Sequence, residues 1–415
     1  MSALQSVRGT HDLYGDAMRR HRYVVETARN LAARYGYEEF DPPLIEFVDV
    51  FARSMGETSD VVSKEMYVFA DRGGDSIALR PEFTAGIMRA VISEGLTHKT
   101  PLKFFCQGPL FRYERPQKGR QRQFHQIGLE LLGVNSAQGD IEAIAIGFDI
   151  LKALGVSHEA TLELNTLGDS ESRQLYRKAI VDYFSHYKNQ LSEDSLKRLE
   201  RNPLRILDSK DEGDKQLVMK APFYGDFLNP ASREFFDEVQ AGLNALGISY
   251  NLNPRLVRGL DYYTHTVFEF VTNSLGAQGT VLAGGRYDDL SKVMGGPDLP
   301  GIGWGAGIER LAMMVKNIPA MARPMAVIPV SDQEQSEALK LAQELRNAGI
   351  AVDMAYSGNM GKRLKRANQA NAAFALILGS EEVKNGQVTV RAMDSGKEEK
   401  LARGKITDYI NSAKL

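Results

Sequence analysis

The chain has 415 residues, and its 51 lysines and arginines against 53 aspartates and glutamates give a formal net charge of −2. This length predicts two or three domains, and the near-zero charge confines any affinity for nucleic acid to local basic patches. The single cysteine, Cys106, excludes an internal disulfide and a thiolate zinc cluster, and it fits a reducing compartment. The sequence shows neither an apolar signal core at its start nor an apolar run of membrane-spanning length, so we expect a cytoplasmic protein without a membrane partner.

The first predicted elements are a helix and an extended segment. Apolar positions such as Val24 and Leu31 recur at roughly helical spacing over residues 15–35. Residues 37–45 are expected to be extended, because two consecutive prolines cannot continue a helix or lie in the middle of a sheet. A helix followed by a proline-bounded strand occurs in many folds, so these elements alone indicate no function.

Residues 77–92 predict a strand that ends at Pro81 and a helix that begins near Thr84. Glu82 and Thr84 lie at the junction. An acid and a hydroxyl at a helix N-terminus most often cap the helix. A carboxylate at that place would also suit an ammonium group of a ligand.

A hairpin is predicted around residues 111–130, with a basic loop between its strands. The two-residue period of extended strands gathers a largely polar set on one face. These residues are Leu110, Arg112 and Glu114 in the first strand and Gln126, Gly128 and Glu130 in the second. The opposite faces are apolar, so the polar face is not simply the solvent side of an amphipathic pair. The loop carries four cations and no acid between Arg115 and Arg122, which suits a polyanion, although a solvated basic turn shows the same pattern.

Residues 111–114, Phe-Arg-Tyr-Glu, are followed by the basic loop and by the string Arg-Gln-Phe-His-Gln over 122–126. Together they resemble the second signature motif of class II aminoacyl-tRNA synthetases, in the form that histidyl-tRNA synthetases carry. By the same resemblance, the helix over 15–35 and the strand after it are similar to the first motif, which forms the dimer interface in that family. The segment 81–84 is similar to the family's Pro-Glu-x-Thr segment, which holds the amino group of the substrate. Phe83 stands where the family usually has glycine.

Beyond the hairpin, residues 138–154 predict an amphipathic helix with a structural role, and residues 161–165 predict a further strand. From 167 to 243 the chain becomes rich in charge and in long helical spacing. Such helices have solvated faces. Members of the family carry a helical insertion at this position, between the two halves of the catalytic domain.

A strand is predicted within residues 256–270, and its face is expected to hold Tyr263, His265, Val267 and Glu269. Adjacent tyrosines in a strand usually pack in a core. Here the string Arg-Gly-Leu-Asp-Tyr-Tyr over 258–263 resembles the histidine-specific signature of the family, so the two tyrosines are assigned to a substrate pocket.

Glycines alternate at positions 301, 303, 305 and 307. A dinucleotide-binding loop is excluded, because position 306 is alanine and no βαβ unit precedes it. Alternate glycines along a strand instead leave one face free of side chains, so that a flat ligand can lie against the backbone. The helix that follows places Arg310 beside this face and resembles the third class II motif, whose arginine holds the terminal phosphate of ATP. Asp289 replaces a glycine that is common in the family.

From residue 324 strands and helices alternate, which predicts a compact α/β domain with a mostly parallel sheet. Ser331 and Glu334 have the spacing of a capping box. The middle helix has a basic end, formed by Lys362, Arg363, Lys365 and Arg366. Such an end is more often a solvated face, but as an appended domain the region resembles the anticodon-binding module of the family.

Patterns and resemblance together predict an α+β chain. The resemblance implies a catalytic domain with an antiparallel sheet flanked by helices, as in class II synthetases, divided into residues 1–166 and 244–322. A helical insertion is expected over 167–243, and an α/β anticodon-binding domain over 323–415.

The resemblance implies an ATP-dependent ligase that joins L-histidine to tRNA(His) through a histidyl-adenylate, with ATP and Mg2+ as cofactors and a homodimer as the assembly. The attacking carboxylate is already anionic, so positioning and charge stabilisation carry the reaction. Arginine suits this task because its planar fork binds phosphate oxygens in pairs.

The resemblance gives each candidate residue a role. The catalytic cations are Arg112 and Arg258. The histidine-binding residues are Glu82, Phe83, Thr84, Arg112, Gln126, Glu130, Arg258, Tyr262 and Tyr263. The ATP-binding residues are Arg112, Glu114, Phe124 and Arg310, and Glu114 is the candidate contact for Mg2+. The contacts with the tRNA acceptor end are Arg115, Gln117, Lys118 and Arg120.

Two alternatives have a different function. The non-catalytic paralogue that regulates ATP phosphoribosyltransferase shares the catalytic fold, but it typically lacks the anticodon module and several of the phosphate-binding arginines. This chain keeps Arg112, Arg258 and Arg310. An RNA-binding protein without catalysis would leave the polar face of the hairpin unexplained.

Overall fold

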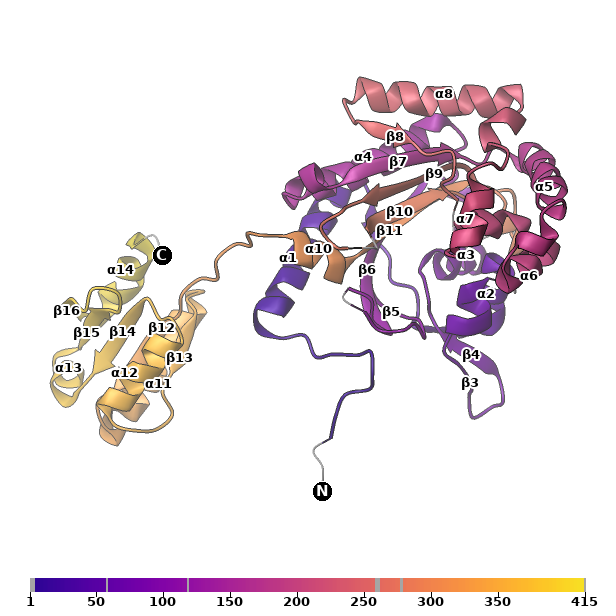
Figure 1. Cartoon of the computed structure of the whole chain (residues 1–415). Helices are drawn as coiled ribbons and strands as arrows, with labels where there is room; N and C mark the ends of the chain where they lie inside the picture. Colours follow the sequence, from indigo (N-terminus) through magenta and orange to yellow (C-terminus); the bar gives the residue numbers. More distant parts are fainter. Residues whose placement is uncertain (1–3, 57–58, 118, 258–261, 277–278, 414–415) are drawn as a thin grey trace. The chain divides into compact units, whose positions relative to one another are not determined.

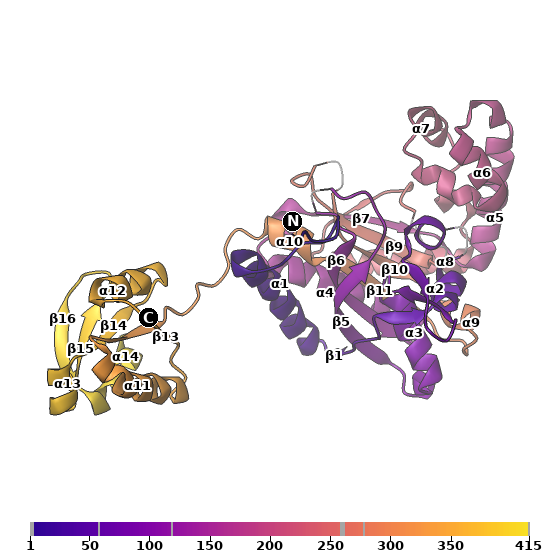
Figure 2. The same ribbon diagram turned by 90° about the horizontal axis from the view of Figure 1, so that it is seen from below.

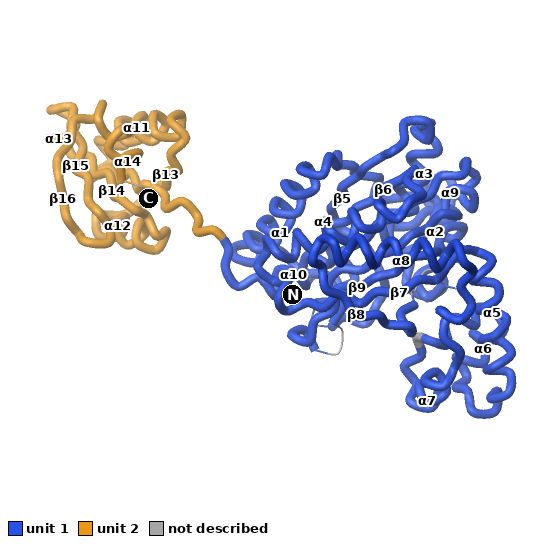
Figure 3. The backbone as a smooth tube through the Cα atoms, turned by 90° about the horizontal axis from the view of Figure 1, so that it is seen from above, with its two compact units in different colours: residues 1–318 blue, residues 319–415 orange. Residues whose placement is uncertain are grey.

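The computed structural model describes residues 4–56, 59–117, 119–257, 262–276 and 279–413. The chain forms two compact units, Met1–Ile318 and Pro319–Leu415 (Figure 3). Each unit has its own hydrophobic core. Within the described residues, no helix combines the length and the apolar character that crossing a membrane requires.

The first unit is built on an eight-stranded sheet in the order β1-β5-β6-β11-β10-β9-β7-β8 (Figure 1). Its strands are β1 (Glu38–Glu39), β5 (Leu102–Phe111), β6 (Gln123–Leu132), β7 (Thr161–Thr166), β8 (Tyr250–Leu252), β9 (Thr264–Val271), β10 (Thr280–Arg286) and β11 (Gly301–Gly307). Neighbours from β5 to β7 are antiparallel, whereas the edge pairs β1–β5 and β7–β8 are parallel. The predicted antiparallel sheet is confirmed, and its order places the hairpin strand β6 beside the glycine-rich strand β11.

One face of this sheet is covered by four helices: α1 (Gly15–Arg34), α4 (Ala137–Ala153), α8 (Pro230–Ala245) and α10 (Ile308–Met314). Helix α8 lies in the segment predicted as an insertion, yet it packs along α4 (Figure 1). Val239 and Leu243, one helical turn apart, place its apolar stripe in the core of the sheet.

The other face carries α2 (Val48–Met55), α3 (Thr84–Ser93), α9 (Leu290–Val293) and a small sheet in the order β2-β4-β3, formed by Ile45–Phe47, Ser76–Leu79 and Val68–Ala70. Three helices of the segment predicted as an insertion, α5 (Ser170–Ser185), α6 (Glu193–Arg201) and α7 (Glu212–Val218), form a group at one end of the unit (Figure 2). Their apolar sides, with buried Tyr176 and Phe184, belong to the same hydrophobic cluster as α2, α3 and α9.

The predicted face of β9 is wrong at His265. This residue has a φ of +42°, which lies in the left-handed region, and the register of β9 with β10 shifts beside it. Its ring therefore packs on Phe235 of α8, with 4.8 Å between ring centroids. Tyr263 and Val267 belong instead to the core on the opposite face. The two-residue period failed here because a bulge interrupts the strand.

A buried ion pair ties α4 to the sheet. The Arg286 guanidinium at the end of β10 donates from Nε to both carboxylate oxygens of Asp140, at 3.2 and 3.0 Å. It also donates from Nη1 to the carbonyl of Val134 at 2.9 Å. Arg286 is 1% exposed and Asp140 is fully buried.

Replacing Asp140 by alanine is expected to lower the free energy of unfolding by about 3–5 kcal/mol, because it leaves the buried Arg286 cation with only the more exposed carboxylate of Asp288 as an ionic partner. Urea unfolding monitored by circular dichroism measures this loss. The control is Asp49→Ala, which removes one partner of the exposed pair with Arg53 and should cost less than about 1 kcal/mol. Equal losses in the two variants would contradict the expectation.

The second unit is a five-stranded sheet in the order β13-β12-β14-β15-β16. The strands are β12 (Met325–Pro329), β13 (Val352–Met354), β14 (Phe374–Leu378), β15 (Gln387–Ala392) and β16 (Glu398–Ala402), and the helices are α11 (Gln335–Asn347), α12 (Met360–Gln369), α13 (Ser380–Asn385) and α14 (Ile406–Ser412). The predicted α/β domain is confirmed.

The prediction of a mostly parallel sheet is wrong for half of this unit. Strand β12 is parallel to β13 and β14, but β15 is antiparallel to both β14 and β16. The segment between β14 and β15 is shorter than the dozen or so residues that a parallel crossover needs. The sequence reasoning also missed β16, whose side chains are largely exposed.

Two local predictions for this unit have clear outcomes. The capping box is confirmed. The Ser331 backbone N–H donates to Glu334 Oε2 at 2.9 Å, and the Ser331 side chain accepts from a backbone N–H in the first turn of the helix. Arg363, expected at the basic end of a helix, is buried instead. Its guanidinium donates to the carbonyls of Gly358 and Pro329, at 2.7 and 2.5 Å.

Candidate active site

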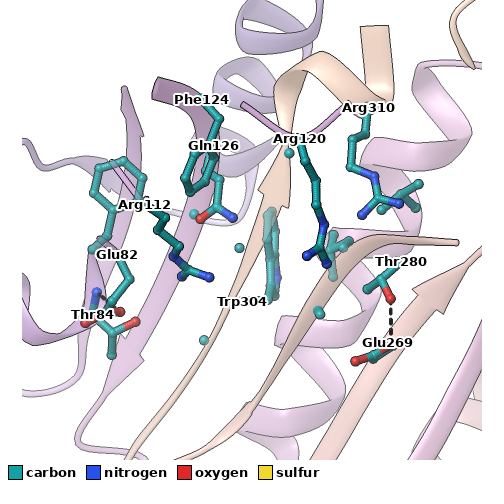
Figure 4. A pocket seen from close by; sticks show the side chains of 18 of the residues that line it. Glu82, Thr84, Arg112, Arg120, Phe124, Gln126, Glu269, Thr280, Trp304 and Arg310 are labelled. Atoms are coloured by element: carbon teal, nitrogen blue, oxygen red, sulfur yellow. Dashed lines mark hydrogen bonds between the residues drawn. The ribbon is translucent and has the colours of Figure 1, made fainter. Parts of the chain in front are cut away.

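A cavity of about 300 Å3 lies over strands β6, β9, β10 and β11 (Figure 4). Side chains from distant parts of the sequence line it. Those expected from the sequence are Glu82, Phe83, Thr84, Arg112, Glu114, Arg120, Phe124, Gln126, Glu130, Tyr262, Tyr263 and Arg310. Arg258 and Lys118 lie outside the described residues, while Arg115 and Gln117 are exposed on the loop between β5 and β6.

The hairpin differs from the prediction in one respect. Strand β5 ends at Phe111, which pairs with Gln123, so Arg112 and Glu114 follow the strand and do not lie on its face. They still reach the cavity. The predicted sharing of one strand face by Leu110, Arg112 and Glu114 is therefore wrong, because Leu110 is buried in the core.

The alternate glycines of β11 give room to side chains of the neighbouring strand. Gly303 pairs with Glu130 of β6, and a Cβ atom at position 303 would collide with that carboxylate. A Cβ atom at position 305 would lie 2.9 Å from Gln126 Oε1. Because β11 has no side chains at these two positions, Glu130 and Gln126 have room to extend over it and face the cavity.

Glu130 is the most deeply buried acid of the cavity, with 2% exposure. Its Oε1 accepts a hydrogen bond from Thr84 Oγ1 at 2.6 Å, and its Oε2 accepts one from the hydroxyl of Tyr287. Burial raises the pKa of Glu130 to about 8, although both hydrogen bonds favour the ionised form. The two donors fix the orientation of the carboxylate. Because the carboxylate is buried, its hydrogen bonds with a polar ligand affect binding strongly.

Glu82 is also buried, and it serves the helix cap that its position predicts. Its two carboxylate oxygens accept from the backbone N–H groups of Thr84 and Ala85, at 2.8 and 2.7 Å. Burial raises the pKa of this carboxyl, against the effect of these hydrogen bonds. The neighbouring Phe83 ring lies 4.7 Å from the guanidinium carbon of Arg80. Glu82 and Thr84 thus stand at one end of the cavity (Figure 4).

Three guanidinium groups reach the cavity from different segments (Figure 4). Arg112 donates from Nε to the carbonyl of Pro81 at 3.0 Å, which leaves its terminal nitrogens toward the cavity. Arg120 pairs with Glu114 at 2.9 Å. Within the described residues, Arg310 makes no hydrogen bond or ion pair, and burial followed by the nearby charge of Arg120 lowers its pKa. Like charges close together in a cavity favour an anionic ligand.

Sequence reasoning missed several residues that line the cavity. Tyr287 has no predicted role, because its contact with Glu130 joins positions far apart in the chain. Glu269 accepts a hydrogen bond from Thr280 Oγ1 at 2.8 Å on the wall opposite Arg112 (Figure 4). Arg120 had been assigned to tRNA, yet its side chain faces the cavity.

The arrangement separates two kinds of binding chemistry. One end offers buried carboxylates and hydroxyls, which suit a polar, hydrogen-bonding ligand with an ammonium group. The other end offers guanidinium groups, which suit phosphate oxygens. Arg112 lies between them (Figure 4), where a carboxylate and a phosphate could meet.

Comparisons with known proteins agree with this geometry. The family model "Histidyl-tRNA synthetase" matches residues 9–311, and the model "Anticodon binding domain" matches residues 325–413. A histidine–tRNA ligase of Rhodospirillum rubrum is 57% identical over 99% of both chains, and one of Gluconacetobacter diazotrophicus is 55% identical over 99% of both.

Solved structures give the same picture. The apo histidyl-tRNA synthetase of S. aureus is 33% identical, has a TM-score of 0.83, and covers 98% of this chain and 99% of its own. A Bacillus halodurans protein described as an ATP phosphoribosyltransferase regulatory subunit/histidyl-tRNA synthetase is 22% identical with a TM-score of 0.66, covering 92% of this chain and 99% of its own. That second likeness concerns the fold alone.

Proposed function

This chain belongs to the histidyl-tRNA synthetase family, and from that premise we propose that it joins L-histidine to tRNA(His) in two steps at the cavity described above. In the first step, a carboxylate oxygen of histidine attacks the α-phosphorus of ATP, and pyrophosphate leaves. In the second step, a ribose hydroxyl of the terminal adenosine of the tRNA attacks the activated carbonyl, and AMP leaves. The observation that carries the proposal is one cavity with buried carboxylates at one end and guanidinium groups at the other.

The residues at the acidic end select histidine. Glu130, held by Thr84 and Tyr287, accepts a hydrogen bond from the imidazole ring, and Tyr263 pairs with the other side of the ring. Glu82, Thr84 and Gln126 hold the α-amino group. An amino acid without a ring N–H would leave the Glu130 carboxylate unpaired, which discriminates strongly against it.

The residues at the basic end hold ATP. Arg112 neutralises the charge that develops where the histidine carboxylate meets the α-phosphate, and Arg310 grips the γ-phosphate. Phe124, whose ring centroid lies 5.7 Å from the Arg112 guanidinium carbon, stacks on the adenine. The reacting carboxylate is an anion already, so no side chain has to remove a proton.

Mg2+ binds proteins through one or two carboxylates together with substrate phosphates. Glu114 and Glu269 line the cavity and supply oxygen donors of this kind. Bound there, the ion would neutralise charge on the pyrophosphate that leaves. The pairing of Glu114 with Arg120 keeps that carboxylate at the cation end of the cavity.

The test of the function is ATP–pyrophosphate exchange measured separately with each amino acid, followed by charging of tRNA(His) with labelled histidine. We expect exchange with histidine alone and transfer to tRNA(His). A chain that binds histidine but shows no exchange would behave like the regulatory paralogue and would overturn the proposal.

A variant in the exposed part of the loop between β5 and β6 can distinguish tRNA contact from amino-acid activation. Arg115 and Gln117 are exposed, in contrast to Arg112 and Arg120. The double variant Arg115→Ala, Gln117→Ala is expected to lower kcat/KM for tRNA on the order of 10- to 100-fold, as loss of contacts with phosphates or base edges does. Its pyrophosphate exchange should equal that of the wild type. A parallel fall of both activities would show that the loop acts on the catalytic cavity instead.

A homodimer is proposed from the small sheet of the first unit. In this sheet, strand β2 pairs with β4 alone among the described strands, so β2 is an edge strand. Its side chains Ile45 and Phe47 are exposed. Exposed Val68 and Phe69 lie on β3 of the same sheet. Apolar side chains on an edge strand mark a site of association.

We also propose a cytoplasmic location, since ATP and tRNA are the substrates.

The substitution Phe47→Asp is therefore expected to shift the protein from dimer to monomer, because burying the new charge in an apolar interface costs several kcal/mol. Light scattering coupled to size exclusion measures the mass. The matched control is Leu339→Asp, a change of a similarly exposed apolar residue on α11, which should leave the mass unchanged. A monomeric wild type, or a dimeric Phe47→Asp variant, would contradict the proposal.

A further inference from the structure

Behind the catalytic cavity, three side chains with metal-ligating atoms come together from three elements. His21 lies on α1, His125 on β6 and Glu309 on α10. One nitrogen or oxygen atom from each residue lies within 4.8 Å of the others. Helix α10 packs against both α1 and β6, so the cluster forms where these elements meet.

Two members of the cluster already hold each other in place. His125 Nδ1 lies 2.7 Å from Glu309 Oε1, and the backbone N–H of His125 donates to both oxygens of the same carboxylate at 3.0 and 3.1 Å. These contacts hold the Glu309 carboxylate in a fixed orientation.

The third member lacks a partner. His21 is only 8% exposed, and its Nε2 finds no hydrogen-bond partner among the described residues. Its ring meets the ring of His125 edge to face, with 4.8 Å between centroids. A buried polar nitrogen without a partner is unfavourable and calls for an explanation. This nitrogen can therefore serve as a ligand atom.

A second cavity, of about 590 Å3, gives access to the cluster. His11, His21 and Glu309 line it, together with residues of α1, α10 and the loop between β5 and β6. Glu309 also lines the catalytic cavity. A small solute in this second cavity can thus reach His21.

We propose that His21, His125 and Glu309 form a binding site for a divalent transition-metal ion of the zinc class. Two imidazoles and one carboxylate are a common three-ligand set that leaves a fourth position for water, and imidazole suits zinc, nickel and copper over magnesium. Tetrahedral ligands at about 2.0–2.1 Å from zinc are about 3.3 Å apart. Since the ligand atoms lie within 4.8 Å of one another, the widest pair has to approach by about 1.5 Å, which side-chain rotation supplies.

The site goes beyond the catalytic function, and its test does not depend on that function. The untagged chain, freed of metal with a chelator, is titrated with Zn2+ by calorimetry and with Co2+ by visible absorption. We expect one tightly bound equivalent and a d–d absorption band typical of low coordination. His21→Gln should weaken binding on the order of 100-fold, because loss of a ligand exceeds the 10- to 100-fold cost of losing a supporting residue.

The matched control is His158→Gln, since His158 is exposed on the same unit. This variant should bind zinc like the wild type. Pyrophosphate exchange with Mg2+ and without added zinc shows whether His21→Gln is folded, because His21 is not among the residues that line the catalytic cavity. Equal zinc affinity of His21→Gln and the wild type overturns the proposal.

A measurement on the wild type avoids any doubt about folding. The chain has seven histidines, and labelled histidine rings give separate nuclear magnetic resonance signals. One equivalent of Zn2+ should shift the ring signals of His21 and His125 and leave those of the exposed histidines in place. Shifts confined to exposed rings would mean surface binding and would refute the site.

Discussion

Glutamine in place of Glu130 is expected to lower histidine-dependent pyrophosphate exchange on the order of 100-fold, the cost of losing a hydrogen bond to a buried charge. Glutamine keeps the size of the side chain and an oxygen that can accept from Thr84 Oγ1. It cannot take up the negative charge that we propose Glu130 acquires when it pairs with the imidazole N–H of bound histidine. Exchange measured over a range of histidine concentrations should show a raised KM for histidine, with the KM for ATP little changed.

The control for this variant is Glu163→Gln, a change in β7 away from the cavity, where Glu163 accepts from Asn251 at 3.4 Å. Its exchange should match the wild type. Full histidine-dependent exchange in Glu130→Gln would remove Glu130 from the proposed pocket, whatever its burial.

The same variant tests the raised pKa of Glu130. Below about pH 4.5 the carboxyl is protonated in both the folded and the unfolded chain, so its ionisation does not affect stability. Between the unfolded value and the folded pKa of about 8, the folded chain retains a proton that the unfolded chain has released. Stability therefore falls as pH rises through this range. Glutamine mimics the protonated form, so urea unfolding without ligand should favour Glu130→Gln over the wild type increasingly from pH 5 to pH 8.

How far the sequence predicts this site depends on the kind of contact. The identity of the cavity residues came from short strings such as 81–84 and 122–126, which are local patterns and can be read along the chain. The contact of Tyr287 with Glu130 joins β10 and β6 across β11. No spacing in the sequence encodes such a contact, because it depends on the order of strands in the sheet.

Backbone irregularities set a second limit. The two-residue period predicted that His265 shares a face with Tyr263, but the left-handed conformation at His265 turned its ring toward α8. The same period carried Arg112 into a strand that ends at Phe111. Periodicity describes regular strands, whereas Arg112 follows the end of a strand and His265 lies at a bulge.

Long-range packing sets a third limit. The charge-rich segment 167–243 looks uniformly solvated, yet Val239 and Leu243 of α8 belong to the main core. Likewise, the exposed strand β16 was missed, because its residues alternate too weakly in hydropathy to show a buried face. Such errors change the boundaries of elements and leave the fold class unaffected.

The second large effect is expected at Arg310, which differs from Arg112 and Arg120 in making neither a hydrogen bond nor an ion pair within the described residues. Arg310→Ala should lower kcat/KM for ATP on the order of 100- to 1,000-fold, since removal of one donor to a developing anion costs about 2.7–4 kcal/mol. Arg310→Lys should restore little activity, because an ammonium group cannot bind two phosphate oxygens through a planar fork. Pyrophosphate exchange at varied ATP measures both variants.

Charge repulsion supplies an independent readout for the same residue. Burial and, after it, the charge of Arg120 lower the pKa of Arg310, so the free protein holds two like charges near each other. Removing one should leave the free energy of unfolding unchanged or raise it, which separates loss of ATP binding from loss of folding. The control, Arg53→Ala in an exposed pair, should change neither activity nor stability beyond about 1 kcal/mol. If Arg310→Ala instead raises the KM for histidine and spares that for ATP, the two ends of the cavity have been assigned in the wrong order.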